Sequence, residues 1–179
     1  MPISPMMAQY WDIKKQHPDY LVFFRLGDFY EMFYDDARLA SKELDLTLTG
    51  RDCGEEERAL MCGVPYHSCE GYIARLLAKG YRIAICEQME DPALAKGLVK
   101  REVTRLITPS TVTETSMLDE GKNNFLAAVW LEGGIAGLAF VEVSTGAVHV
   151  TETEGGIPAL SGELLRFAPR EILVAPGIP

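Results

Sequence analysis

The sequence predicts an α+β protein, in which a mixed sheet flanked by helices is followed by an incomplete α/β unit. Short apolar or alternating runs, typical of strands, are interleaved with helical patterns over residues 1–110. After the polar, aperiodic stretch 111–122, three strand patterns follow one another with turn residues between them. A chain of 179 residues has room for one complete domain and part of a second. We therefore expect a first domain over 1–110, a linker over 111–122 and a truncated second domain over 123–179.

Capping signals predict three helices in the first domain. The serine–proline pair at 4–5 is typical of a helix start, and Pro18 ends that helix. Acidic residues in the first turn, which complement the helix dipole, favour a second helix over 35–44. The third helix is expected to have Ser68 as its N-cap and to close at Gly80. Strands are expected over 20–26, 46–49, 59–64, 81–86 and 103–107, the last at an edge of the sheet.

The second domain is expected to open with three antiparallel strands. The joints between them, at 132–134 and 144–146, contain the glycines that are typical of hairpin turns. A helix and a fourth strand complete a β-β-β-α-β order. The expected elements are strands over 125–131, 135–143 and 147–150, a helix over 158–167 and a strand over 171–175.

Net charge restricts the kinds of partner. The chain carries a formal charge of −9, but the first domain holds 14 basic against 17 acidic residues and the remainder 3 against 9. Two thirds of the acidic excess therefore lies beyond the first domain. No basic stripe is present, and this argues against non-specific binding along a phosphate backbone. Any contact with nucleic acid should be local.

Composition also indicates the compartment. An apolar share of 47% is ordinary for a packed globular protein. No apolar run approaches the roughly 18 residues that span a bilayer, and the N-terminus lacks the features of a signal peptide. The four cysteines form no CxxC pair, so free thiols fit them better than disulfides. We expect a cytoplasmic protein that does not enter a membrane.

One segment, residues 26–33, combines aromatic rings with a single carboxylate. The preceding apolar run indicates a strand, and the glycine and aspartate at 27–28 supply turn chemistry. If the chain is extended afterwards, Phe29 and Glu31 point to one side and Tyr30 to the other. A flat ring beside a hydrogen-bond acceptor suits a probe inserted between stacked bases. The alternative is that the rings belong to the core and the carboxylate is solvated.

Several segments resemble one family in the same order along the chain. Residues 27–33, followed by Asp35-Asp36-Ala37, resemble the N-terminal mismatch-recognition domain of the MutS family of bacterial DNA mismatch repair proteins. Residues 123–128 resemble the start of that family's second, connector domain. The resemblance implies a MutS N-terminal fold for the first domain and a truncated ribonuclease H-like unit for the second. Further matching segments are 5–10, 63–67, 85–88 and 104–109.

The resemblance implies recognition of a mispair or unpaired base in double-stranded DNA, and hence a role in DNA repair. Phe29 would enter the kinked duplex from the minor groove, and Glu31 would bond the edge of the mispaired base. Arg51 and Arg101 fall on positions that contact phosphates. Solvated charge is the alternative for both arginines, and burial in the core is the alternative for two further groove-lining candidates. The expected DNA-binding residues are Phe29, Glu31, Arg51, Arg101, Leu26 and Met61.

Full-length members of the family carry an ATPase near the C-terminus, which uses ATP and Mg²⁺. They form homodimers and act with MutL. No GxxxxGK[ST] phosphate loop occurs in this chain, and no nucleophile–base–orienter set is evident. We therefore expect no catalytic residue and no cofactor in this fragment.

Two other function classes remain open from the residues alone. A metal-dependent nuclease could use clustered carboxylates to hold Mg²⁺, although two of them are better explained as acids at a helix start. A structural or protein-binding module would instead bury the aromatic ring. Zinc is disfavoured because the Cys and His spacing fits no common pattern. The residues concerned are Asp28, Glu31, Asp35 and Asp36 for magnesium, and Cys62, His67 and Cys69 for zinc.

Overall fold

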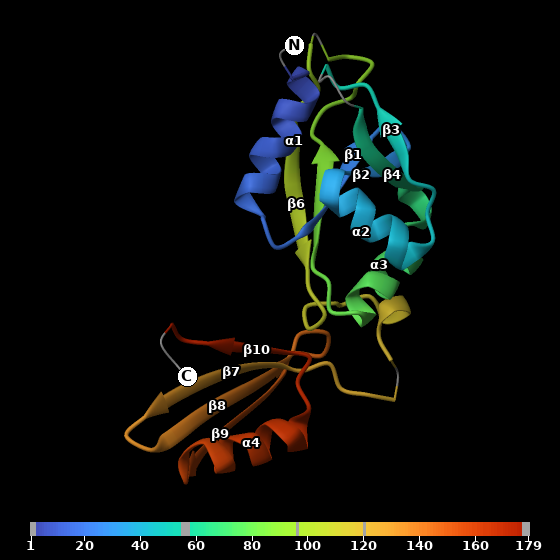
Figure 1. Cartoon of the computed structure of the whole chain (residues 1–179). Coiled ribbons are helices and arrows are strands. Elements are labelled where there is room, and N and C mark those ends of the chain that lie inside the picture. Colours follow the sequence, from blue (N-terminus) through green and yellow to red (C-terminus); the bar gives the residue numbers. More distant parts are fainter. Residues whose placement is uncertain (1–2, 55–57, 96, 120, 177–179) are drawn as a thin grey trace. The chain divides into compact units, whose positions relative to one another are not determined.

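The computed structural model describes residues 3–54, 58–95, 97–119 and 121–176. The chain divides into two compact units, 1–108 and 109–179 (Figure 1). The stretch expected to be a linker, 111–122, falls within the second unit. There Val112 is buried and Thr115–Met117 form a short 3-10 helix. Our domain boundaries at 110 and 123 stay predictions.

The first unit is built on a six-stranded mixed sheet with the order β3-β4-β2-β1-β5-β6. The β1 strand is antiparallel to β2 and parallel to β5, and this combination makes the sheet mixed. The position of β6 at one edge confirms the expected edge strand. The strands are β1 Leu21–Leu26, β2 Phe29–Phe33, β3 Thr49–Arg51, β4 Ala59–Pro65, β5 Ile83–Gln88 and β6 Arg101–Ile107.

Helices cover both faces of this sheet, α1 on one side and α2 and α3 on the other (Figure 1). The apolar side of α1 (Pro5–Gln16) packs its Met7 and Tyr10 against alternate strand residues such as Phe24. The thiol of Cys62, on β4, donates a hydrogen bond to the Ala37 carbonyl of α2 (Tyr34–Leu44). The third helix, α3, spans Glu70–Ala78.

Local signals failed at two element boundaries in the first unit. The expected strand 46–49 is wrong, because α2 ends in a left-handed Asp45 whose φ is 57° and Leu46 still bonds back to Ser41. The strand β3 starts only at Thr49. The predicted N-cap at Ser68 is also wrong, since residues 66–68 form a 3-10 helix and α3 begins two residues later.

Other boundary signals held. The predicted serine N-cap of α1 accepts a hydrogen bond from the backbone N–H of Met7. Gly80 follows the C-cap of α3 with a φ of +87°, as a helix-terminating glycine should. The strand expected over 81–86 is present but shifted by two residues, to Ile83–Gln88. All four cysteines are free thiols.

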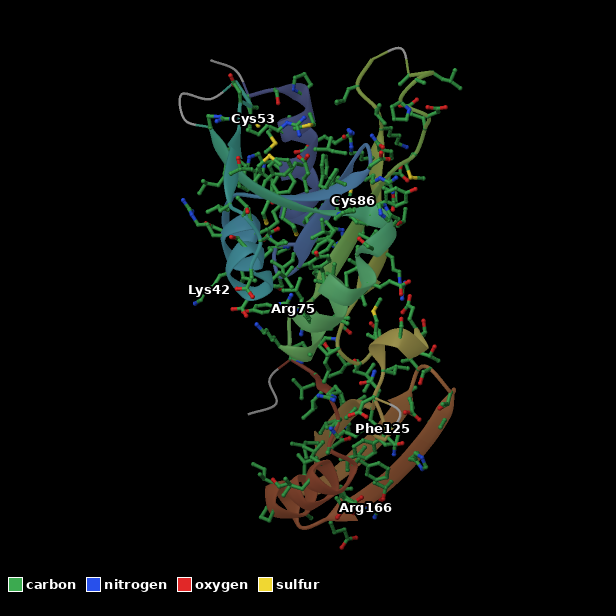
Figure 2. The ribbon with its side chains drawn as sticks, turned by 90° about the vertical axis from the view of Figure 1, so that its right-hand side faces the viewer. Lys42, Cys53, Arg75, Cys86, Phe125 and Arg166 are labelled. Carbon is green, nitrogen blue, oxygen red and sulfur yellow. The ribbon has the colours of Figure 1, made fainter. Side chains whose placement is uncertain are left out.

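The second unit has a four-stranded sheet with the order β10-β7-β8-β9. The three expected antiparallel strands, the helix and the fourth strand are confirmed, and the fourth pairs parallel to the first. Phe125 and Phe140 form the core beneath the helix, and Phe167 of α4 stacks on the ring of Phe140 (Phe125 is labelled in Figure 2). The elements are β7 Leu126–Glu132, β8 Ile135–Glu142, β9 Ala147–Glu154, α4 Gly156–Phe167 and β10 Glu171–Val174.

Two mixed sheets with helices packed against them confirm the α+β expectation. The ribonuclease H-like character of the second unit stays a prediction. No helix in the described parts of the chain is long and apolar enough to cross a membrane.

Candidate nucleic-acid interface

The hairpin between β1 and β2 presents Phe29 to solvent. Leu26 pairs directly with Phe29, so the turn has only two central residues. Gly27 is the first of them, with a φ of +57°, which is typical of the turns that suit the twist of a hairpin. Phe29 is 46% exposed whereas Tyr30 is 5% exposed. The extended conformation therefore directs the Phe29 ring outward and the Tyr30 ring into the core.

Several contacts hold this turn in place. The Arg25 side chain donates from Nε to the Gly27 carbonyl at 2.5 Å, and its guanidinium lies 3.4 Å from the centre of the Tyr66 ring. The backbone N–H of Tyr66 donates to the Asp28 carbonyl at 3.0 Å. Arg101 donates from Nε to the Arg25 carbonyl at 2.8 Å. The exposed ring is therefore carried by a braced turn.

Strand register gathers the predicted DNA-binding residues on one face of the sheet. Cross-strand partners share a face, so Leu26 lies beside Phe29, and Glu31 follows on the same side two residues along β2. Met61 of β4 and Arg51 of β3 have the same orientation by their registers. This is the face on which α1 packs. The hairpin and two further strands thus bring together residues that are up to 35 positions apart in sequence.

Glu31 is paired with Arg51. The Nη1 atom of Arg51 donates to Oε2 of Glu31 at 2.7 Å, and the two side chains are 39% and 14% exposed respectively. Burial raises the pKa of the Glu31 carboxyl above its ordinary value of 4.5, and the Arg51 guanidinium offsets part of that rise. No local pattern indicates this pair, because the two residues are 20 positions apart.

Arg101 is turned into the protein. It is 7% exposed, and its Nη1 donates to Gln9 at 3.1 Å and to the Val99 carbonyl at 3.0 Å. Its guanidinium also lies 5.0 Å from the centre of the Phe24 ring, and burial lowers its pKa. A phosphate contact would require this side chain to swing outward, and it stays a prediction.

Leu26 and Met61 are both half-buried and pack against the core cluster beneath α1. Each contributes to the core and keeps part of its surface accessible to a ligand. Their contact with a DNA groove stays a prediction.

Three of the four carboxylates considered for magnesium, Glu31 among them, have separate protein partners. Asp36 accepts hydrogen bonds from Lys14 and from the Val22 backbone N–H, whereas Asp35 pairs with Arg38 at the surface. Among the residues that the structure describes, no group of three or more His, Cys, Asp or Glu side chains could hold a metal ion.

A cluster of polar side chains next to the hairpin was not predicted from the sequence. The Tyr30 hydroxyl donates to the Glu87 carboxylate, and Arg25 lies 3.5 Å from the same carboxylate. Burial and the Glu87 hydrogen bond both raise the pKa of the Tyr30 hydroxyl. A signal was present: an arginine at the end of the apolar run 21–24 needs a partner on the adjacent strand or helix.

Comparison with known proteins defines the class. The family model for MutS domain I matches residues 4–116, and the model for MutS domain II matches residues 124–179. The chain belongs to the MutS family.

Individual relatives agree with this assignment. The chain is 58% identical over 174 residues to the DNA mismatch repair protein MutS of Ruminiclostridium cellulolyticum, covering 96% of this chain and 20% of that protein. It is 58% identical over 175 residues to the MutS protein of Carboxydothermus hydrogenoformans, and this match covers 97% of this chain and 21% of that protein. It is 55% identical over 181 residues to the MutS protein of Desulforamulus reducens, and this match covers 99% of this chain and 21% of that protein. The chain spans about a fifth of the length of these relatives.

Proposed function

We propose that this chain recognises mispaired or unpaired bases in double-stranded DNA, as part of a longer mismatch repair protein. The observation that carries the proposal is the exposed Phe29 ring on a braced hairpin, with the Glu31 carboxylate on the same face of the sheet. The names of its relatives, which it matches over nearly its whole length, support the same function.

The mechanism would be recognition by deformability. A mispair stacks poorly, so a kink there costs less than at a matched step, where unstacking costs about a few kcal/mol. Phe29 would enter from the minor groove and stack on the mispaired base, a contact worth about 1–3 kcal/mol. Leu26 and Met61 would line the groove beside it. Arg51 and Arg101 would hold phosphates, which fix position and carry no sequence information.

Glu31 would supply selectivity. A carboxylate near phosphates is unfavourable unless it receives a hydrogen bond or a proton. A mispaired base that has left its stack can offer a donor, whereas a matched base pair keeps its donors engaged. Matched DNA would therefore be disfavoured by a penalty rather than by the lack of an attractive contact.

The remaining functions belong to the longer protein. This chain would carry no catalytic residue and bind no cofactor, while ATP and Mg²⁺ would bind elsewhere in a full-length protein. That protein would act in the cytoplasm as a homodimer, together with MutL.

The test is loss of the ring in a protein of full family length. Residues 1–179 can replace the matching segment of the Ruminiclostridium relative, giving a chimaera whose affinities for matched and mispaired duplexes are measured by fluorescence anisotropy. Phe29→Ala should abolish the preference for the mispaired duplex. Phe29→Tyr keeps an aromatic ring that can stack and should retain most of the preference for the mispaired duplex. An unchanged preference in Phe29→Ala would refute the insertion of the Phe29 ring.

A further inference from the structure

We propose that Arg51 determines specificity by acting through Glu31: its ion pair in the free protein sets the penalty that a matched duplex must overcome. This inference rests on the proposed function. It gives Arg51 a role distinct from a phosphate contact, which strengthens binding to every duplex alike.

The pair spans three adjacent strands of the sheet. Glu31 lies in β2 and Arg51 in β3, and the strand order places β4 between them. The 2.7 Å contact therefore joins the edge strand to the hairpin that carries Phe29. The β4 residue opposite Glu31 is Gly63. A Cβ at this position would lie 3.4 Å from Cγ of Glu31, so the Glu31 side chain packs closely over the glycine.

Arg51 dominates the charge around Glu31. The residues directly opposite Glu31 are Phe24 on β1 and Gly63 on β4, and neither titrates. From β6, the Arg101 guanidinium bonds Arg25, Val99 and the uncharged Gln9 of α1. Within the described part of the chain, Arg51 is the charged group that acts on the pKa of Glu31.

Two opposing effects meet at this carboxyl group. Burial raises the pKa of Glu31, and Arg51 lowers it. Arg51 therefore keeps the carboxylate ionised down to a lower pH than burial alone would allow. On binding, the Arg51 guanidinium turns toward a phosphate, and a matched duplex offers Glu31 no donor in its place, so Glu31 must take a proton from solvent when that duplex binds. This protonation lowers the affinity for the matched duplex about tenfold for each unit by which the pH exceeds the pKa of Glu31. By lowering the pKa, Arg51 raises the cost.

A mispair removes the cost. A donor on the displaced base replaces the hydrogen bond from Arg51, and Glu31 stays ionised. The Arg51 side chain, which is 39% exposed, is able to turn toward a phosphate of either duplex. On mispaired DNA the base donor thus replaces the hydrogen bond that Glu31 loses from Arg51, whereas on matched DNA nothing replaces it.

Binding by the chimaera provides the first test. Affinities for a matched duplex and for one with a single unpaired base are measured across a pH series. In Arg51→Ala the discrimination ratio should fall by about tenfold for each unit by which the pKa of Glu31 rises. Phosphate contacts by Arg51 affect both duplexes and cancel in this ratio. Arg51→Lys keeps the charge and should restore part of the ratio.

A double-mutant cycle separates the two roles of Arg51. In a Glu31→Gln background the group that Arg51 acts on is gone, so Arg51→Ala should leave the discrimination ratio unchanged. If Arg51→Ala lowers the ratio equally in both backgrounds, or in neither, the inference is overturned while the proposed function stands. A chimaera that shows no preference for the unpaired base overturns the proposed function, and this inference with it.

The second test needs no DNA. The side-chain carboxyl carbon of Glu31 is titrated by NMR in the 179-residue chain, with Glu31→Gln identifying its signal. Arg51→Ala should move the titration midpoint to higher pH. The matched control is Arg75→Ala, which removes another partly exposed, ion-paired arginine from the same unit. Figure 2 shows Arg75 at the opposite end of that unit from Cys53, which follows Arg51 by two residues. An unchanged midpoint in Arg51→Ala overturns the inference.

Discussion

The buried carboxylate of Asp36 allows a sharp test of what holds the first unit together. One of its oxygens accepts from Nζ of Lys14 at 2.9 Å, and the other from the Val22 backbone N–H at 3.0 Å and the Tyr10 hydroxyl at 3.3 Å. Asp36→Asn keeps the shape but places an amide NH₂ against at least one of these donors. It also leaves the Lys14 ammonium, whose side chain is only 20% exposed, without its counter-charge.

The loss of unfolding free energy expected for Asp36→Asn follows from the burial of this ion pair. Removing one partner of a buried ion pair costs about 3–5 kcal/mol. Because Lys14 is partly exposed and also donates to the Tyr20 carbonyl at 2.6 Å, we expect the lower end, about 3 kcal/mol. The matched control is the neighbouring Asp35→Asn. Its side chain is 92% exposed, so the same chemical change should cost less than about 1 kcal/mol.

Urea denaturation measures the difference. The chain has two tryptophans, Trp11 in α1 and Trp130 in β7, so a Trp130→Phe background makes fluorescence report on the first unit. With a slope of about 1–2 kcal/mol per molar urea, Asp36→Asn should lower the midpoint by about 1.5–3 M. If the Asp35 and Asp36 variants unfold at the same urea concentration, the buried network does not carry the stability assigned to it.

Three further outcomes are expected. Phe33→Ala, which empties a fully buried site, should cost about 3–5 kcal/mol of unfolding free energy, whereas Phe29→Ala at the exposed site should cost less than about 1 kcal/mol; similar urea midpoints would contradict the outward placement of the Phe29 ring. Burial raises the pKa of Glu31 in the folded state, so the contribution of this group to stability is complete below its ordinary value of 4.5 and is lost as pH rises through the folded value. Glu31→Gln should therefore gain stability relative to the wild type as pH rises through that window, and a difference that is constant with pH would argue against burial. Gly63→Ala places a Cβ 3.2 Å from a backbone oxygen and should destabilise the first unit by about 1–3 kcal/mol, while Gly71→Ala, where nothing lies within 4 Å, should be neutral or stabilising in the same urea assay.

Features that depend on neighbours in the chain were predictable. The serine cap of α1, the glycine after α3 and the two-residue turn at Gly27 all depend on a few adjacent residues. Alternation placed Phe29 and Glu31 opposite Tyr30, because an extended chain has a period of two whatever surrounds it. The resemblance to the MutS family was also present in the sequence, and the family comparisons confirmed it.

The partners of the charged residues were decided by the tertiary structure. Glu31 pairs with Arg51 across β4, and Arg101 is buried rather than solvated. Asp36, expected as an acid at a helix start, is the centre of a buried network as well. Each of these contacts joins strands or helices that are distant in sequence, so it depends on strand order and register. A local pattern specifies the direction in which a side chain points, and only the assembled sheet specifies which group it meets there.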